Sequence, residues 1–85
     1  MKQETGFTQV KNEVLEDKNL SWKAKGLFTY LYSRPDGWDF SIERIVTGSS
    51  DDIETTQAGL LELEKQGYLK RQNNIININF IKETM

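Results

Sequence analysis

The spacing of the apolar residues changes at Gly67, and this change constrains the fold more than any other feature. Before Gly67, apolar residues recur at three- and four-residue intervals, which is the period of an α-helix that buries one side. After it, Ile76, Ile78 and Phe80 alternate with polar residues, which is the period of a β-strand. The sequence therefore predicts a mainly helical α+β domain with a small β-hairpin.

Residues suited to begin and end helices divide the first part of the chain. Ser21 and Ser41 each stand before apolar residues at helical spacing, where a serine oxygen can accept a hydrogen bond from a free backbone N–H. The first of these two helices is expected to end at Arg34-Pro35 and the second, a short one, at Gly48. Upstream, residues 7–10 are expected to form an edge strand or an extended arm, and residues 11–18 a short helix or helical turn.

A third helix is expected between residues 51 and 66. Either Ser49 with Asp52, or Asp51 with Glu54, can form its N-terminal capping pair, and Gly67 is expected to stop it. The residues expected to face the core are Ile53, Thr56, Leu60 and Leu63.

The segment after Gly67 is expected to form a hairpin over residues 68–81. Its strands are 68–71 and 76–80, joined at Asn73-Asn74, because asparagine tolerates positive φ. This order of elements predicts a winged helix-turn-helix, with a three-helix core and a short wing. Residues 1–85 would form a single domain, with 41–66 as the helix-turn-helix, 68–81 as the wing and 1–6 flexible.

The composition excludes several kinds of chemistry. The chain has 85 residues, no cysteine and no histidine, so disulfides, thiolate metal sites and histidine-based catalysis are absent. Neither a P-loop nor a calcium loop is present, and we expect no enzyme activity and no cofactor. Because no apolar run approaches the roughly 20 residues that span a bilayer and the start lacks a signal-peptide core, we expect a cytoplasmic protein.

Three stretches in the first half of the chain carry a resemblance to a known family. FTQV at 7–10, NEVL at 12–15 and LSWKAKGL at 20–27 resemble the N-terminal domains of phage and bacterial replisome-organiser, or replication-initiation, proteins. PDGWDFS at 35–41 is similar to that family's link into the helix-turn-helix, and LLELEKQGYL at 60–69 is similar to the recognition-helix end and first wing strand of many winged-helix regulators. The resemblance implies a winged helix that binds replication-origin or operator DNA through its third helix and wing.

A DNA-binding domain of this kind would use two groups of residues on double-stranded DNA. Base contacts are expected from Thr55, Gln57 and Ala58 on the outer side of the third helix, because glutamine can pair with adenine and the other two can touch a thymine methyl. The residues expected to hold the sugar-phosphate backbone are Arg44, Lys70, Arg71, Asn73 and Asn74. Such a domain would serve a phage, plasmid or bacterial replication-initiation or transcription-regulation system.

The charge of the third helix leaves a second function open. Residues 51–66 carry five acidic side chains and one basic side chain, a balance of −4, which would weaken binding to phosphates. The alternative is a protein-interaction or inhibitor module that binds a host or replication protein. Its candidate interface residues are Asp51, Asp52, Glu54, Leu61, Glu62, Trp22 and Tyr30. A homodimer formed through the wing strand or the aromatic residues is a third possibility.

Overall fold

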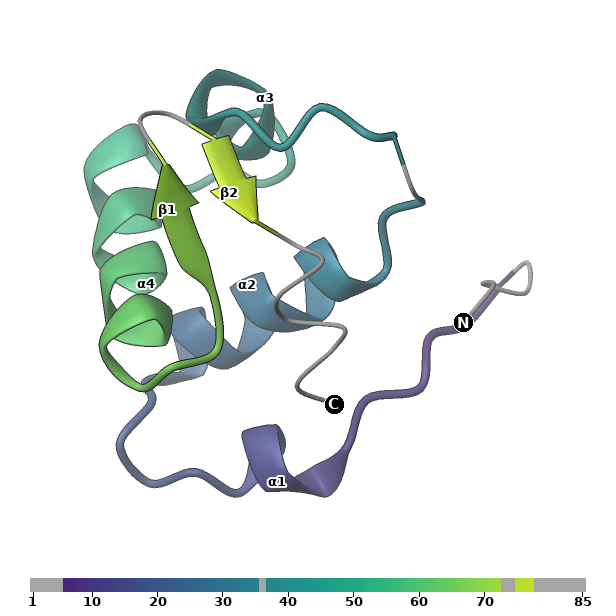
Figure 1. Ribbon diagram of the computed structural model, residues 1–85, viewed down its shortest axis with the longest axis vertical. Helices are drawn as coiled ribbons and strands as arrows, with labels where there is room; N and C mark the ends of the chain where they lie inside the picture. Colours follow the sequence, from purple (N-terminus) through teal and green to yellow (C-terminus); the bar gives the residue numbers. More distant parts are fainter. Residues whose placement is uncertain (1–5, 36, 73–74, 78–85) are drawn as a thin grey trace.

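Four helices and a two-stranded antiparallel hairpin make up the part of the chain that the computed structural model describes, residues 6–35, 37–72 and 75–77 (Figure 1). The helices are α1 (Asn12–Leu15), α2 (Trp22–Tyr32), α3 (Ile42–Val46) and α4 (Ile53–Lys65), and the strands are β1 (Lys70–Gln72) and β2 (Ile75–Asn77). The fold is therefore mainly helical with a small hairpin, as expected.

Serine caps begin α2 and α3 at the residues that the sequence predicts. The Ser21 Oγ accepts a hydrogen bond from the Ala24 N–H at 3.2 Å, and the Ser41 Oγ accepts one from the Arg44 N–H at 3.3 Å. Helix α2 ends at Tyr32, just before Arg34-Pro35, as expected.

The start of α4 differs from the prediction. Its cap is Asp52, whose Oδ1 accepts a hydrogen bond from the Thr55 N–H at 2.8 Å, so neither of the two expected capping pairs forms. The Ser49 Oγ instead accepts a hydrogen bond from the Asp51 N–H at 3.1 Å and holds the turn that precedes the helix. Asp52 has the extended backbone of a cap, with φ −78° and ψ 176°, so the helix begins at Ile53 rather than at residue 51.

Gly67 ends α4, as the sequence predicts. Its φ is +85°, a left-handed conformation that a side chain disfavours. The Gly67 N–H donates to the Glu64 carbonyl at 3.1 Å and the Tyr68 N–H donates to the Leu63 carbonyl at 2.9 Å. These two bonds satisfy carbonyls that the last turn would otherwise leave free.

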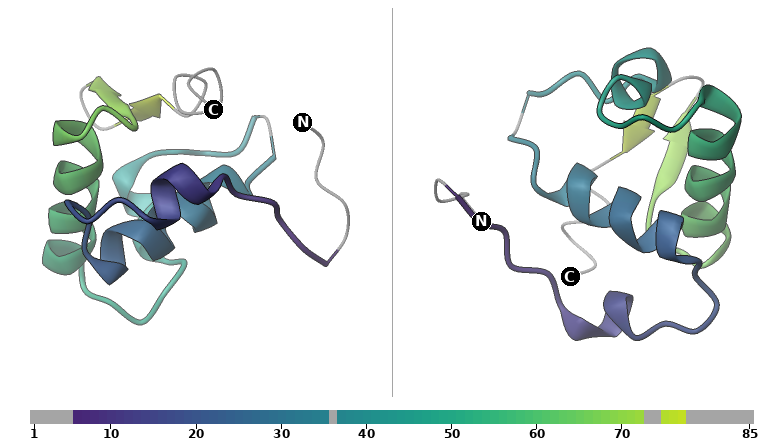
Figure 2. Two further views of the ribbon diagram at one scale, coloured as in Figure 1. Left: turned by 90° about the horizontal axis from the view of Figure 1, so that it is seen from below. Right: turned by 180° about the vertical axis from the view of Figure 1, so that it is seen from behind.

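The core lies between α2, α4 and the hairpin. Thr56, Leu60 and Leu63 of α4 are buried, as predicted, whereas Ile53 is 48% exposed and the prediction that it is buried is wrong. Ile53 is in phase with Leu60 but occupies the first position of the helix. Figure 2 (left) shows the hairpin and α2 on opposite sides of the molecule, with α4 reaching between them along one edge.

The hairpin is pinned to the segment before α3. Strands β1 and β2 pair with Lys70 opposite Asn77 and Gln72 opposite Ile75, so β1 begins two residues later than predicted. Ser41 forms an isolated antiparallel bridge with Ile75, and the Ile76 N–H donates to the Phe40 carbonyl at 3.1 Å. This third extended segment was not predicted from the sequence. Asn73, Asn74 and residues 78–81 of the predicted wing lie outside the described residues.

The segment before α2 contacts the core at a few residues. Residues 7–10 form an extended arm rather than a strand, with Val10 half-buried against the core and Phe7 63% exposed. Helix α1 is shorter than the expected 11–18, and its Val14 is buried. The Tyr68 hydroxyl donates to the Asp17 Oδ2 at 2.7 Å, which ties the segment after α1 to the start of the hairpin.

No helix within the described ranges is both long enough and apolar enough to cross a membrane.

Candidate functional site

Helix α4 exposes one side along its whole length. Glu54, Ala58, Leu61 and Lys65 follow one another at intervals of four, three and four residues, which places them in one row on an α-helix. All four are exposed, and Leu61 retains 45% of its accessible surface. We call this row the outer stripe. It points away from the buried residues of α4 and is open to a large partner.

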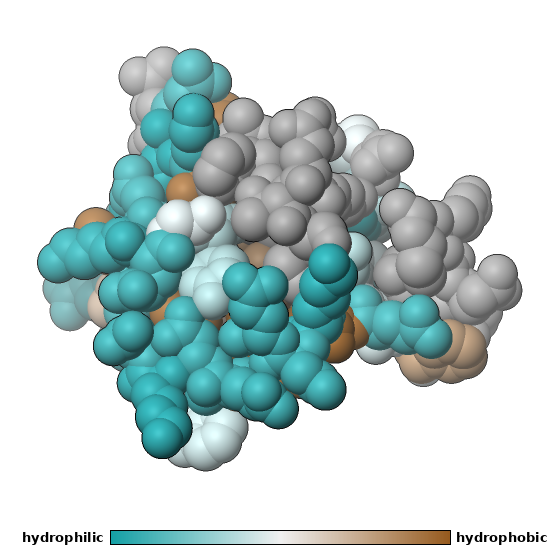
Figure 3. Space-filling view, turned by 60° about the horizontal axis from the view of Figure 1, so that its bottom comes forward, coloured by the Kyte–Doolittle hydropathy of each residue, from teal (hydrophilic) through white to brown (hydrophobic). Residues whose placement is uncertain are grey.

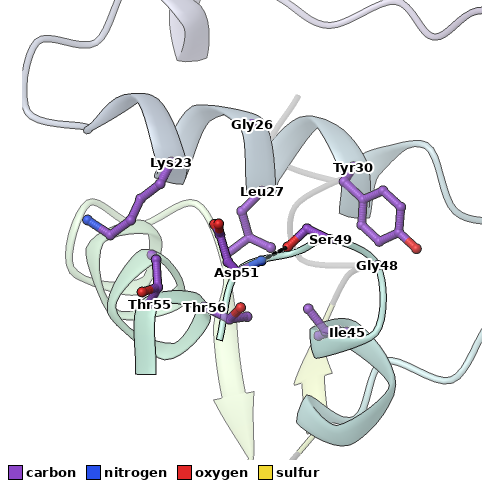
Figure 4. Close-up of a pocket in the computed structure, with 11 residues that line it drawn as sticks. Lys23, Gly26, Leu27, Tyr30, Ile45, Gly48, Ser49, Asp51, Thr55 and Thr56 are labelled. Carbon is purple, nitrogen blue, oxygen red and sulfur yellow. Dashed lines mark hydrogen bonds between the residues drawn. The ribbon is translucent and has the colours of Figure 1, made fainter. Parts of the chain in front are cut away.

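The three residues predicted to contact bases do not share this stripe. Ala58 lies in it, but Thr55 and Gln57 are half-buried. Residues two positions apart on a helix point about 200° apart, so Thr55 and Gln57 lie on opposite flanks of α4. Thr55 lines a pocket against α2 (Figure 4). The structure therefore places only Ala58 of this group at the centre of the exposed surface.

The residues predicted to hold a nucleic-acid backbone lie on two elements. Arg44 is exposed on α3, and the centre of its guanidinium lies 5.3 Å from the centre of the Trp38 ring. Lys70 is exposed and Arg71 half-buried on β1, where Arg71 pairs with Ile76. Asn73 and Asn74 belong to the parts of the chain that are not described, so the structure does not place them.

Glu62 has an internal role that the sequence analysis missed. Its Oε1 accepts a hydrogen bond from the Ser21 N–H at 2.8 Å, and its Oε2 accepts bonds from the Ser21 hydroxyl and the Lys23 ammonium, both at 2.8 Å. The bond from Lys23 and then those from Ser21 lower the pKa of Glu62 to about 2. Glu62, a candidate interface residue of the alternative function, thus ties α4 to α2.

The two aromatic residues of the alternative interface lie apart. Trp22, at the start of α2, is 84% exposed, and the Lys25 ammonium lies 4.7 Å from the centre of its ring. Tyr30 is half-buried two turns later and meets Trp38 edge to face at 6.0 Å. Eight residues of helix separate their backbones by about 12 Å. The two rings therefore do not form one aromatic patch.

The acidic residues of the alternative interface differ in the hydrogen bonds and ion pairs that they form. Asp51, Asp52 and Glu54 are exposed. The hydrogen bond from the Thr55 N–H lowers the pKa of Asp52, which caps the helix. When Lys23 is counted with its partner Glu62, the balance of −4 over residues 51–66 becomes −3. The start of α4 thus remains acidic.

Exposed apolar side chains do not merge into a broad patch on the side shown in Figure 3. There, hydrophilic residues predominate and the hydrophobic ones appear as separate spots among the residues that are coloured.

A pocket of about 240 Å³ lies between α2, the α3–α4 turn and the first two turns of α4 (Figure 4). Its lining residues are Lys23, Gly26, Leu27, Tyr30, Ile45, Gly48, Ser49, Asp51, Thr55, Thr56 and Gly59. At Gly59 the two helices approach closely, because a Cβ there would lie 3.1 Å from the Leu27 Cδ2. The pocket is separate from the outer stripe.

Comparisons with protein-family models, with curated proteins and with solved structures find no match to this chain.

Proposed function

We propose that this protein is a winged helix-turn-helix domain that binds double-stranded DNA, with the outer stripe of α4 in the major groove. The observation that carries the proposal is that this stripe is uncovered from end to end and has Ala58 near its middle. A methyl side chain lets the helix backbone come close to base edges and can contact a thymine methyl. The host system would be phage, plasmid or bacterial replication initiation or transcription regulation.

The link between the hairpin and α3 supports the winged arrangement. The Ser41–Ile75 bridge and the bond from Ile76 to Phe40 fix β2 against the residues that lead into α3. Because α3 and α4 are joined by a short turn, these contacts hold β2 close to both helices. Such an arrangement suits a domain that must hold a helix and a wing against one duplex at once.

Three cations outside α4 supply the contacts to phosphates in this proposal: Arg44, Lys70 and Arg71. Three phosphate contacts correspond to a slope of about −2.7 in a plot of log binding constant against log salt concentration. Since the start of α4 is acidic and the phosphate contacts are few, we expect binding to depend only moderately on salt and to rely on base contacts for much of its strength.

The experiment is a fluorescence-anisotropy titration of labelled mixed-sequence duplex at low salt with the wild-type protein and Ala58→Glu. Glutamate favours helix and Ala58 is exposed, so the variant should fold. A carboxylate in the middle of the stripe should weaken duplex binding at least about tenfold, a cost of about 1.4 kcal/mol that like-charge contacts reach.

The matched control is Gln9→Glu, which adds the same charge at an exposed residue of the arm, on the side of the molecule away from α4 (Figure 1). It should leave duplex affinity almost unchanged. If wild-type protein fails to bind duplex at tens of micromolar, where non-specific binding of such modules is expected, the proposal is wrong.

A second candidate function is binding to a basic protein surface through the same side of α4. It is favoured by one observation, the exposed apolar side chain of Leu61, at 45%, in the same row as the exposed acid Glu54. Glu54→Gln separates the two candidates: it should strengthen duplex binding if α4 meets phosphates, and weaken capture of a basic partner if α4 meets a protein.

A further inference from the structure

The pocket between α2 and the α3–α4 turn combines apolar walls with a carboxylate. Leu27, Tyr30 and Ile45 supply the apolar surface, and Figure 4 shows the Asp51 side chain turned toward α2. Pockets that hold a ligand commonly have this composition, mostly apolar with a few polar groups that set orientation.

Asp51 carries the negative charge of this pocket. No described residue donates a hydrogen bond to its carboxylate, and its own backbone N–H donates to the Ser49 Oγ at 3.1 Å. Lys23, the cation of the pocket lining, forms an ion pair with Glu62 instead, with its ammonium 2.8 Å from the Glu62 Oε2. In Figure 4 the Lys23 side chain also extends away from Asp51. An occupant of the pocket therefore meets an uncompensated negative charge.

Gly26 leaves one wall of the pocket without a side chain, although no close contact requires a glycine at this position. It lies inside α2, where glycine is unfavourable, and a Cβ built on it would meet nothing within 4 Å. The other two glycines of the lining differ, because a Cβ on Gly48 would collide with the Tyr30 ring and one on Gly59 would press on Leu27. Among the three glycines that line the pocket, Gly26 is therefore the one where a side chain would meet no neighbouring atoms.

We infer that this pocket receives a lysine or arginine side chain of a protein partner. The aliphatic stem would lie on Leu27 and Ile45, and the cationic end would pair with Asp51. Charge complementarity selects this occupant, since a phosphate or an acidic side chain would be repelled by the same carboxylate. The site is independent of DNA binding, because it lies on the α2 side of α4 and not on the outer stripe.

Nuclear magnetic resonance with small probes tests the inference. The chain has six glycines, of which Gly26, Gly48 and Gly59 line the pocket and Gly6, Gly37 and Gly67 do not. Butylguanidinium, 1-butanol and butyrate are titrated into the ¹⁵N-labelled protein as a cation, a neutral analogue and an anion of similar length. The pocket glycines should shift with the cation and saturate, with an affinity up to about fivefold above that of the alcohol, the ratio that an exposed ion pair provides.

Two variants locate the binding. Asp51→Asn should reduce the affinity for butylguanidinium to that of the alcohol, and Gly26→Leu should abolish binding of both by filling the pocket. Leucine favours helix over glycine, so the second variant should keep the fold, which its amide spectrum verifies. Equal affinity for cation, alcohol and anion, or no shift of the pocket glycines at tens of millimolar butylguanidinium, would overturn the inference. Duplex titration of Gly26→Leu should match wild type, so failure here is distinct from failure of the proposed DNA binding.

Discussion

Glu62 links α2 and α4 by accepting hydrogen bonds on both carboxylate oxygens. Its partners are the backbone and hydroxyl of Ser21 and the ammonium of Lys23. The same Ser21 Oγ caps α2, so a single serine orders the start of one helix and binds the last turn of another. Charge-assisted bonds of this kind are stronger than neutral ones, which makes this cluster the main polar connection between the two helices within the described ranges.

The low pKa of Glu62 predicts how stability depends on pH. The folded-state pKa is about 2 and the ordinary value is 4.5, so the unfolded chain takes up the proton first as pH falls. The cluster therefore stabilises the fold fully above about pH 4.5, and this contribution is lost between pH 4.5 and 2. Glu62→Gln should lower the free energy of unfolding at pH 7 by about 1 to 2 kcal/mol, discounted for partial exposure.

Urea unfolding at pH 7 and near pH 2 measures this effect. The difference between wild type and Glu62→Gln should be present at pH 7 and nearly absent at the lower pH. Glu64→Gln, an exposed position on the same helix, serves as the control and should change stability by less than about 0.5 kcal/mol. An equal loss for Glu62→Gln at both pH values would contradict the assignment.

Alanine at Gly48 and alanine at Gly26 should change the stability of the fold in opposite directions. A Cβ on Gly48 would lie 2.7 Å from the Tyr30 ring, which is held by Trp38 on one side and by the Arg34 guanidinium on another. Gly48→Ala should therefore destabilise the fold by about 1 kcal/mol through overpacking. Gly26→Ala meets open space inside a helix and should stabilise it by up to about 1 kcal/mol. Thermal unfolding compares the two, and a stabilised Gly48→Ala would show that the ring gives way.

At the scale of elements, local chemistry decided what could be predicted. The caps at Ser21 and Ser41 and the stop at Gly67 depend on the few residues around them, and all three are where the sequence places them. Gly48 does follow α3, but the reason is different: it lacks the positive φ of a helix-ending glycine and makes room for Tyr30 instead. At the start of α4, Ser49, Asp51 and Asp52 are all residue types that can cap a helix, and the sequence alone did not show that Asp52 is the cap.

The end of α4 provides a test at this scale. Gly67 has φ +85°, and alanine in that conformation is strained. Gly67→Ala should lower stability by about 1 kcal/mol, whereas Gly67→Asn should cost less, because asparagine tolerates the left-handed region. Chemical denaturation of the two variants against wild type measures the difference. Equal losses for both variants would contradict the glycine-based helix stop.

Contacts between residues far apart in the chain could not be predicted from the sequence. Nothing near Ser41 indicates that it bridges to Ile75, although the alternation of Trp38, Asp39 and Phe40 is a weak sign of a short extended segment. Helical phase placed Glu62 outward, and only the position of α2 shows that Ser21 and Lys23 meet it. Likewise Ile53 has the right phase for the core but stands in the first turn, where it stays exposed.

At the scale of the whole molecule, α4 presents different surfaces to two sides. Its outer stripe is free along its length, and its α2 flank borders the pocket that holds Asp51. The two surfaces share an acidic helix start but differ in shape, one convex and continuous, the other concave and small. We therefore propose different partners for them, DNA at the stripe and a basic side chain at the pocket.

The most direct measurement of the central claim is an amide chemical-shift map of the ¹⁵N-labelled protein titrated with a short duplex at low salt. Our account predicts that the shifts concentrate on the outer stripe of α4, from Glu54 to Leu61, and on β1, while α1 and the arm at residues 7–10 stay unchanged. Saturable binding whose shifts fall on α1 or the arm and spare α4 would contradict it.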